Sequence, residues 1–109
     1  MGPNLLATVQ IDLHDKVAED FQEDLLRAVE RHDCRGAVID ITGLVIVDSY
    51  VARVLADTAR MARLMGVETV LVGMRPEVAA TLVRMGYRMQ GVRTALNVDE
   101  GLALLSGRS

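Results

Sequence analysis

The chain has few of the residues that mark disulfide-rich, metal-binding or membrane proteins. Its single cysteine, Cys34, cannot form a disulfide within the chain, which fits a reducing compartment. Only three residues are aromatic, and none of them is Trp. No apolar run approaches the roughly 18 residues that a membrane helix requires. The start of the chain also lacks the basic segment and apolar core of a signal peptide. We therefore expect a cytoplasmic protein.

The composition that remains is typical of a small α/β domain with an aliphatic core. The 109 residues correspond to one domain, and half of them are hydrophobic. The net charge of −3 is unevenly distributed, because residues 1–48 carry ten acids against four Lys or Arg residues, whereas residues 49–109 carry five against eight. The basic residues are spread out and have no aromatic neighbours, so a nucleic-acid surface is not indicated. The opposite charges indicate either two solvated faces or surfaces that help copies to pack together.

Strand-like and helix-like segments alternate along the sequence. Val9, Ile11 and Leu13 alternate with polar residues, as in a half-buried strand. The predicted strands cover residues 7–13, 36–42, 68–74 and 93–98, and the predicted helices cover residues 17–34, 49–65, 76–85 and 99–105. This alternation predicts an α/β fold with a mostly parallel sheet of four to five strands and helices packed against it. We assign the domain to residues 7–109 and interpret residues 1–6 as a disordered or shortened N-terminal segment.

Finer features of these helices also follow from the sequence. Gly66 and Gly86 are predicted to end the second and third helices, and Asp99 to start the last one. The second helix is predicted to turn six residues inward: Val51, Val54, Leu55, Thr58, Ala62 and Met65.

Sites for metals and phosphate cofactors are not indicated. His14 and His32 are 18 residues apart on different predicted elements, and Cys34 stands alone. The segment "GVETVLVGM" lacks the Lys-Ser/Thr pair of a phosphate-binding loop and the triple glycine of a dinucleotide site. Asp40 lies within its strand and no Lys follows a late strand, so a receiver-type phospho-acceptor is not indicated either. We expect no metal and no cofactor.

The segment "VIVDSYVARVL" places Asp48 and Ser49 directly before a helix. Both residue types are favoured helix caps, and such a pair is more often a cap than a modification site. If Asp48 caps the helix, however, the hydroxyl of Ser49 stays free in the first turn. Tyr50 is expected to be an exposed neighbour, and tyrosine is enriched at protein interfaces. A hydrolase using Ser49 and His14 is an alternative of a different class, although the Gly-x-Ser-x-Gly elbow is missing.

Thr81 is a second hydroxyl that the helical spacing places at the surface. It shares an outward face with Glu77 and Arg84 in "PEVAATLVRMG", and its default interpretation is a solvated residue.

Four segments together resemble a known family: "FQEDLLRAVE", "GAVIDITGLVIVDSYVARVL", "MARLMGVETVLVGMRPEVAATLVRMGY" and "TALNVDEGLALL". They are similar to the STAS domain of anti-sigma factor antagonists, and within that group to RsbS-type scaffolds of the bacterial stressosome. The resemblance runs from residue 7 to residue 105. An ordinary antagonist has Ser-Gly-Leu or Thr-Gly-Leu after the Asp, whereas "SYVARVL" here favours the stressosome branch. Relatives have a short extra strand ahead of the first predicted one, so "MGPN" is interpreted as a shortened or engineered start.

The resemblance implies a non-enzymatic scaffold that associates with itself and with longer STAS-domain paralogues. Such an assembly sequesters a serine/threonine kinase and releases it upon phosphorylation, and a PP2C-type phosphatase resets it. The family's phospho-acceptor falls on Ser49, with Asp48, Tyr50 and Arg53 as the partner-binding surface, and a further acceptor of the paralogues aligns with Thr81. The alternative within this fold is a simple antagonist that binds a kinase-type anti-sigma factor one to one.

Overall fold

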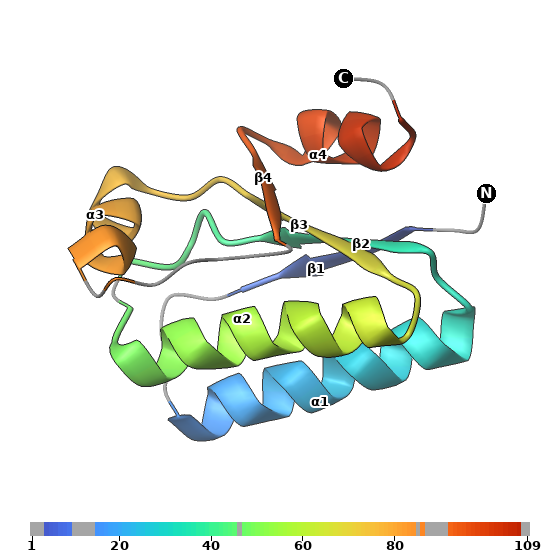
Figure 1. Ribbon diagram of the computed structural model, residues 1–109, viewed down its shortest axis with the longest axis horizontal. Helices are drawn as coiled ribbons and strands as arrows, with labels where there is room; N and C mark the ends of the chain where they lie inside the picture. Colours follow the sequence, from blue (N-terminus) through green and yellow to red (C-terminus); the bar gives the residue numbers. More distant parts are fainter. Residues whose placement is uncertain (1–3, 10–14, 46, 85, 87–91, 108–109) are drawn as a thin grey trace.

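The computed structural model describes residues 4–9, 15–45, 47–84, 86 and 92–107. Strands and helices alternate throughout this part of the chain (Figure 1). The elements are β1 (Asn4–Thr8), α1 (Asp15–His32), β2 (Gly36–Asp40), α2 (Ser49–Leu64), β3 (Glu68–Val72), α3 (Pro76–Arg84), β4 (Arg93–Ala95) and α4 (Val98–Leu105).

The four strands form one parallel sheet in the order β1-β2-β3-β4. Ala37 in β2 is paired with Leu5 on one side and with Thr69 on the other. Because every connection joins parallel strands, each crossover contains a helix, and the helices must cover the faces of the sheet. The predicted single α/β domain with a parallel sheet is confirmed.

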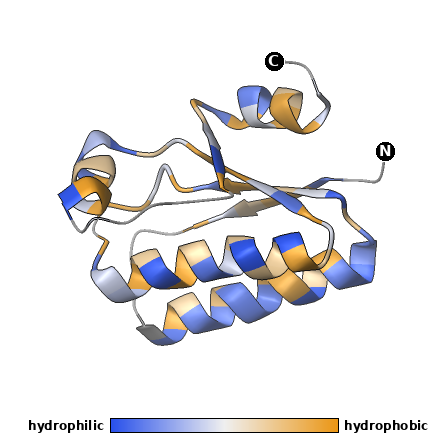
Figure 2. Ribbon diagram, in the orientation of Figure 1, coloured by the Kyte–Doolittle hydropathy of each residue, from blue (hydrophilic) through white to orange (hydrophobic). Residues whose placement is uncertain are grey.

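Two helical layers bury the two faces of the sheet. Helices α1 and α2 lie side by side on one face, and α4 lies on the other (Figure 1). The core under α1 and α2 includes Leu25, Ile39, Leu55 and Leu71, all nearly inaccessible to solvent. The smaller core under α4 consists of Val38, Val70 and Val72 with partly buried residues of α4. In Figure 2, hydrophobic and hydrophilic residues interleave along α1 and α2, as in amphipathic helices that cover a core.

The first strand begins earlier than its sequence pattern predicts. Strand β1 spans Asn4–Thr8 instead of residues 7–13, so residues 4–6 belong to the sheet and do not precede the domain. Leu5 and Ala7 continue the same alternation as Val9, and the pattern therefore identifies the buried face without fixing the start. The pairing of Asn4 with Gly36 sets the start. Residues 10–14 of the predicted strand lie outside the described residues.

Two predictions at helix ends are also wrong. Helix α4 is capped by Asn97, whose side chain accepts a hydrogen bond of 2.9 Å from the backbone N–H of Glu100, so Asp99 lies in the first turn instead of starting the helix. Met65, predicted to face inward, is 45 % exposed. It follows the last residue of α2, where Gly66, with a φ of 86°, turns the chain away as predicted.

Candidate functional site

The loop that leads from β2 to α2 is held by a cluster of polar contacts. Asp40 Oδ1 accepts hydrogen bonds from the backbone N–H of Thr42 at 2.9 Å and from its hydroxyl at 2.6 Å. Arg75 Nε, beyond the end of β3, donates to the Thr42 carbonyl at 2.7 Å. Further along the loop, Leu44 and Val47 are buried in the main core. The hydrogen bonds of Thr42 and the burial of Leu44 and Val47 therefore hold this loop in place before α2 begins.

The start of α2 presents a capped helix and an unpaired hydroxyl. Asp48 has extended backbone angles, and its Oδ1 accepts a hydrogen bond of 2.8 Å from the N–H of Val51. The predicted cap at Asp48 is confirmed. Ser49 is the first residue of the helix and is exposed, and within the described part of the chain its hydroxyl has no hydrogen-bond partner. An accessible hydroxyl thus lies at the positive end of a helix dipole.

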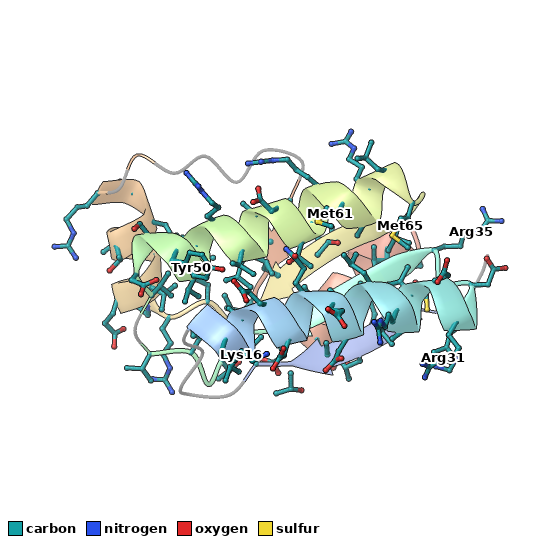
Figure 3. All side chains as sticks on the ribbon, turned by 90° about the horizontal axis from the view of Figure 1, so that it is seen from below. Lys16, Arg31, Arg35, Tyr50, Met61 and Met65 are labelled. Carbon is teal, nitrogen blue, oxygen red and sulfur yellow. The ribbon has the colours of Figure 1, made fainter. Side chains whose placement is uncertain are left out.

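Tyr50 is less exposed than its sequence position predicts. It is half-buried and packs against the main core. Its hydroxyl donates a hydrogen bond to Glu19 Oε2, so that its side chain points toward α1 (Figure 3). Tyr50 therefore joins the start of α2 to α1 and offers a partner only the part of its ring that remains accessible.

Arg53 is exposed one turn after Ser49, on the same face of α2. Further along the helix, an exposed ion pair of 2.9 Å joins Asp57 and Arg60. Among the described residues no ion pair involves Arg53. A guanidinium is therefore available close to the Ser49 hydroxyl.

Thr81 differs from Ser49 in its hydrogen bonding. It is half-buried in α3, and its hydroxyl donates to the carbonyl of Glu77 at 2.9 Å. A kinase would have to break this contact with the helix backbone before it could use the Thr81 oxygen.

The residues considered for other chemistry are His14, His32 and Cys34. His14 lies outside the described residues, His32 is exposed near the end of α1, and Cys34 is buried. Where side chains are described, no group of three or more His, Cys, Asp or Glu residues could hold a metal ion. None of the helices described is both long enough and apolar enough to span a bilayer.

Two contributions to this site were missed from the sequence: the contacts of Asp40, Thr42 and Arg75, and the hydrogen bond from Tyr50 to Glu19. Gly73 was the available signal for the first of them. Its φ is 74°, and a Cβ there would meet the Thr42 hydroxyl at 2.0 Å, so a glycine at the end of β3 marks a close approach.

Comparison with known proteins identifies the domain. The STAS domain family matches residues 3–101. The chain belongs to the STAS domain family. This STAS domain superposes on Moorella thermoacetica RsbS carrying a serine-to-glutamate substitution, with a TM-score of 0.82, 38 % identity, and coverage of 95 % of this chain and 88 % of that one. It matches a chain of a stressosome structure with the same TM-score, 40 % identity, and coverage of 95 % and 90 %.

A longer protein, the RsbT co-antagonist RsbRA of Bacillus subtilis, is 35 % identical over 85 residues, which are 78 % of this chain and 31 % of RsbRA. The chain thus spans about a third of the length of the RsbR-type curated relatives that it matches. These similarities support a stressosome-type STAS regulatory protein.

Removing the Asp48 cap is expected to destabilise the STAS domain. Asp48→Ala leaves the Val51 N–H without its partner and should lower the free energy of unfolding by about 1 kcal/mol in urea denaturation. Asp57→Ala, in the middle of the same helix, is the matched control, because it removes only an exposed ion pair and should change stability by less than about 0.5 kcal/mol. Equal losses in the two variants would contradict the capping role.

Proposed function

We propose that this STAS domain is a non-catalytic scaffold and regulatory subunit of a stressosome, which holds a serine/threonine kinase and releases it when Ser49 is phosphorylated. The observation that carries the proposal is the exposed, unpaired Ser49 hydroxyl at the start of a helix that Asp48 already caps. The similarity to RsbS stressosome structures and to proteins named as RsbT co-antagonists supports it. The solved RsbS variant gains a negative charge at a serine, the same sense of change that phosphorylation brings.

The electrostatics at Ser49 are nearly balanced. A phosphate adds about −1.5 to −2 charges, which the helix N-terminus stabilises by about 0.3–1 kcal/mol. The Asp48 carboxylate opposes it, because two unit charges about 6 Å apart in water repel by about 0.7 kcal/mol. Arg53, one turn away, provides a compensating cation of comparable effect. Phosphorylation should therefore leave the fold intact.

A partner must then read the modification. A kinase docked over Ser49 and Arg53 would cover the serine oxygen and exclude water from it. A phosphate at that oxygen would be a buried dianion, of which Arg53 can match only one charge, and burying the unmatched charge costs several kcal/mol. The modified scaffold would consequently expel the kinase, with Asp48 and the accessible part of Tyr50 at the edge of the contact.

The remaining partners complete this cycle in the cytoplasm. Longer STAS-domain paralogues would form the large assembly together with this chain, and a PP2C-type phosphatase would remove the phosphate. Thr81 is a secondary acceptor, because its hydroxyl is bound to the Glu77 carbonyl in the unmodified domain.

Mass spectrometry after incubation with the cognate kinase and ATP tests this proposal. Ser49 should be the main phosphorylated residue, and Thr81 should be modified less, because its hydroxyl must first leave the helix backbone. Mixed with a longer paralogue, the protein should also elute as a megadalton-scale particle. This particle should retain the kinase while Ser49 is unmodified.

Stoichiometric phosphorylation elsewhere with Ser49 unmodified would contradict the site. A stable one-to-one complex with a kinase-type anti-sigma factor, without a large particle, would favour the simple antagonist instead.

A further inference from the structure

Strand β1 is an edge of the sheet, and its outer side pairs with no other described strand. It stands first in the order β1-β2-β3-β4 and lies beside α1, so only its β2 side is paired within the described part of the chain (Figures 1 and 3). Its sequence, "NLLAT", contains no charged residue and no proline, which are two means by which natural edge strands prevent further pairing. The edge is therefore open to another strand.

The backbone of β1 directs every second residue to this outer side. The N–H of Val9 donates to the carbonyl of Asp40 at 2.9 Å, so the backbone groups of Val9 face β2. Such groups alternate in direction along a strand, and those of Ala7 therefore also face β2, whereas those of Leu6 and Thr8 point away from the sheet. No described strand pairs with these outward N–H and C=O groups.

An apolar groove runs along this edge on the side of α1. It has a volume of about 270 Å³, and α1 contributes Phe21, Leu25 and Ala28 to its lining. Asp24 adds a negative charge to the lining, and its side chain is exposed. Among the described residues no ion pair involves Asp24. The groove is thus apolar with an unmatched acid.

The opposite face of β1 is accessible as well. Leu6 is 56 % exposed, because α4 packs over Val38 and Val70 in the two neighbouring strands. A further strand beside β1 would continue the sheet past Leu6 and cover part of its side chain. The unpaired edge, the groove and the exposed leucine therefore all lie along the same short strand.

We propose that the outer edge of β1 binds an extended segment of a partner protein, which adds to the sheet as a further strand. Unpaired backbone donors and acceptors select an extended segment, because a helix keeps these groups bonded internally. Side chains at alternate positions of the segment would enter the groove and contact Phe21 and Leu25, so apolar residues are expected there. Asp24 favours a Lys or Arg on the same side of the segment.

This contact is separate from the proposed phosphorylation site. The groove is formed by β1 and α1, whereas Ser49 and its neighbours belong to α2 and the loop before it. The inference does not rest on the proposed function, and it can be tested on the purified chain without a kinase.

Fluorescence anisotropy with a labelled synthetic peptide tests the added strand. The probe Thr-Lys-Thr-Val-Thr-Val-Thr-Lys-Thr carries valine and lysine on one face, and its dissociation constant should be about 100 µM or lower. The control Thr-Lys-Thr-Thr-Val-Val-Thr-Lys-Thr has the same composition without the alternation, and it should bind at least about tenfold more weakly.

N-methylation of the probe distinguishes strand pairing from simple insertion into the groove. One peptide is methylated on the threonine nitrogens and the other on the valine and lysine nitrogens. Only alternate N–H groups of an added strand face β1, so one of the two peptides should lose binding and the other should retain it. Equal effects of the two methylation patterns would contradict strand addition.

Variants of the chain locate the contact. Leu6→Pro removes an outward N–H at the centre of β1 and should weaken binding by about tenfold or more, whereas the matched control Leu6→Ala keeps this donor. Pairing with β2 does not use this N–H, so the fold should persist, and circular dichroism checks it. Asp24→Lys changes an exposed residue; it should weaken binding of the lysine probe and favour a probe in which glutamate replaces both lysines.

Several results would overturn the proposal. They are the absence of saturable binding up to about 1 mM, equal affinity for the alternating and control peptides, and unchanged affinity in a folded Leu6→Pro variant. An Asp24→Lys variant without changed peptide preference would also contradict it, whether or not Leu6→Pro folds. A native dimer that Leu6→Pro dissociates would show that a second copy occupies the edge in place of a partner segment. Loss of Ser49 phosphorylation would instead count against the proposed function alone.

Discussion

Ser49→Glu is expected to raise the dissociation constant for the kinase by at least about a hundredfold. The glutamate carboxylate would lie at the first residue of α2, where the native hydroxyl is exposed and unpaired. Under a docked kinase this charge would be removed from water, and the exposed Arg53 one turn along offsets only part of the cost of several kcal/mol. Binding of the fluorescently labelled kinase to the assembled scaffold would measure the loss.

Two variants test whether kinase release depends on the presence of the charge and on its position. Ser49→Ala removes the acceptor oxygen without adding charge, so the kinase should bind and stay bound in the presence of ATP. Ser106→Glu adds the same charge at another exposed serine, beyond the end of α4, and should leave kinase binding unchanged. If Ser106→Glu released the kinase as effectively as Ser49→Glu, net charge and not a docking site at α2 would explain the effect.

Ser49→Glu should barely affect folding. At the first turn of a helix a glutamate is stabilised by the dipole, while the neighbouring Asp48 repels it by a similar amount. The unfolding midpoint of Ser49→Glu in urea should therefore stay close to that of the native domain. A large loss of stability would mean that kinase release results from a damaged helix and not from a local charge.

Local features of this site could be read directly from the sequence. The capping of α2 by Asp48 involves a contact only three residues away, and α2 and α3 each end two residues before a glycine with positive φ, Gly66 and Gly86. Helical periodicity also placed Thr58 inward, where it is fully buried and its hydroxyl accepts a hydrogen bond from Gln22. Such features depend on neighbours along the chain, which sequence patterns record well.

Features that depend on distant neighbours could not be read in this way. Tyr50 is half-buried, whereas its place beside Ser49 predicts an exposed side chain. Its partner Glu19 is 31 residues earlier, on a helix that only the parallel sheet brings alongside α2. The start of β1 likewise depends on pairing with β2, since every odd residue from Leu5 to Leu13 is apolar and the alternation alone allows several frames.

The contacts of Asp40, Thr42 and Arg75 before α2 are a third feature of this kind, and they require a residue without a side chain at Gly73. Gly73→Ala is expected to lower the free energy of unfolding by about 1.5–3.5 kcal/mol. The backbone φ of 74° costs an alanine about 1–2 kcal/mol. The new Cβ would also lie 2.0 Å from the Thr42 hydroxyl and displace it from Asp40, with the loss of a hydrogen bond worth about 0.5–1.5 kcal/mol. Urea denaturation monitored by circular dichroism would measure the change.

Gly66→Ala is the matched control for the backbone contribution. Gly66 has a φ of 86°, but a Cβ there would meet no atom within 4 Å, so this variant should lose only about 1–2 kcal/mol. The excess loss in Gly73→Ala then measures the clash with Thr42, and adding Thr42→Ala should cost less in the Gly73→Ala background than in the native one. Equal losses at Gly66 and Gly73, with additive effects at Thr42, would show that the loop before α2 is not held by this contact. A measured excess would tie the end of β3 to the path by which the chain reaches Asp48 and Ser49.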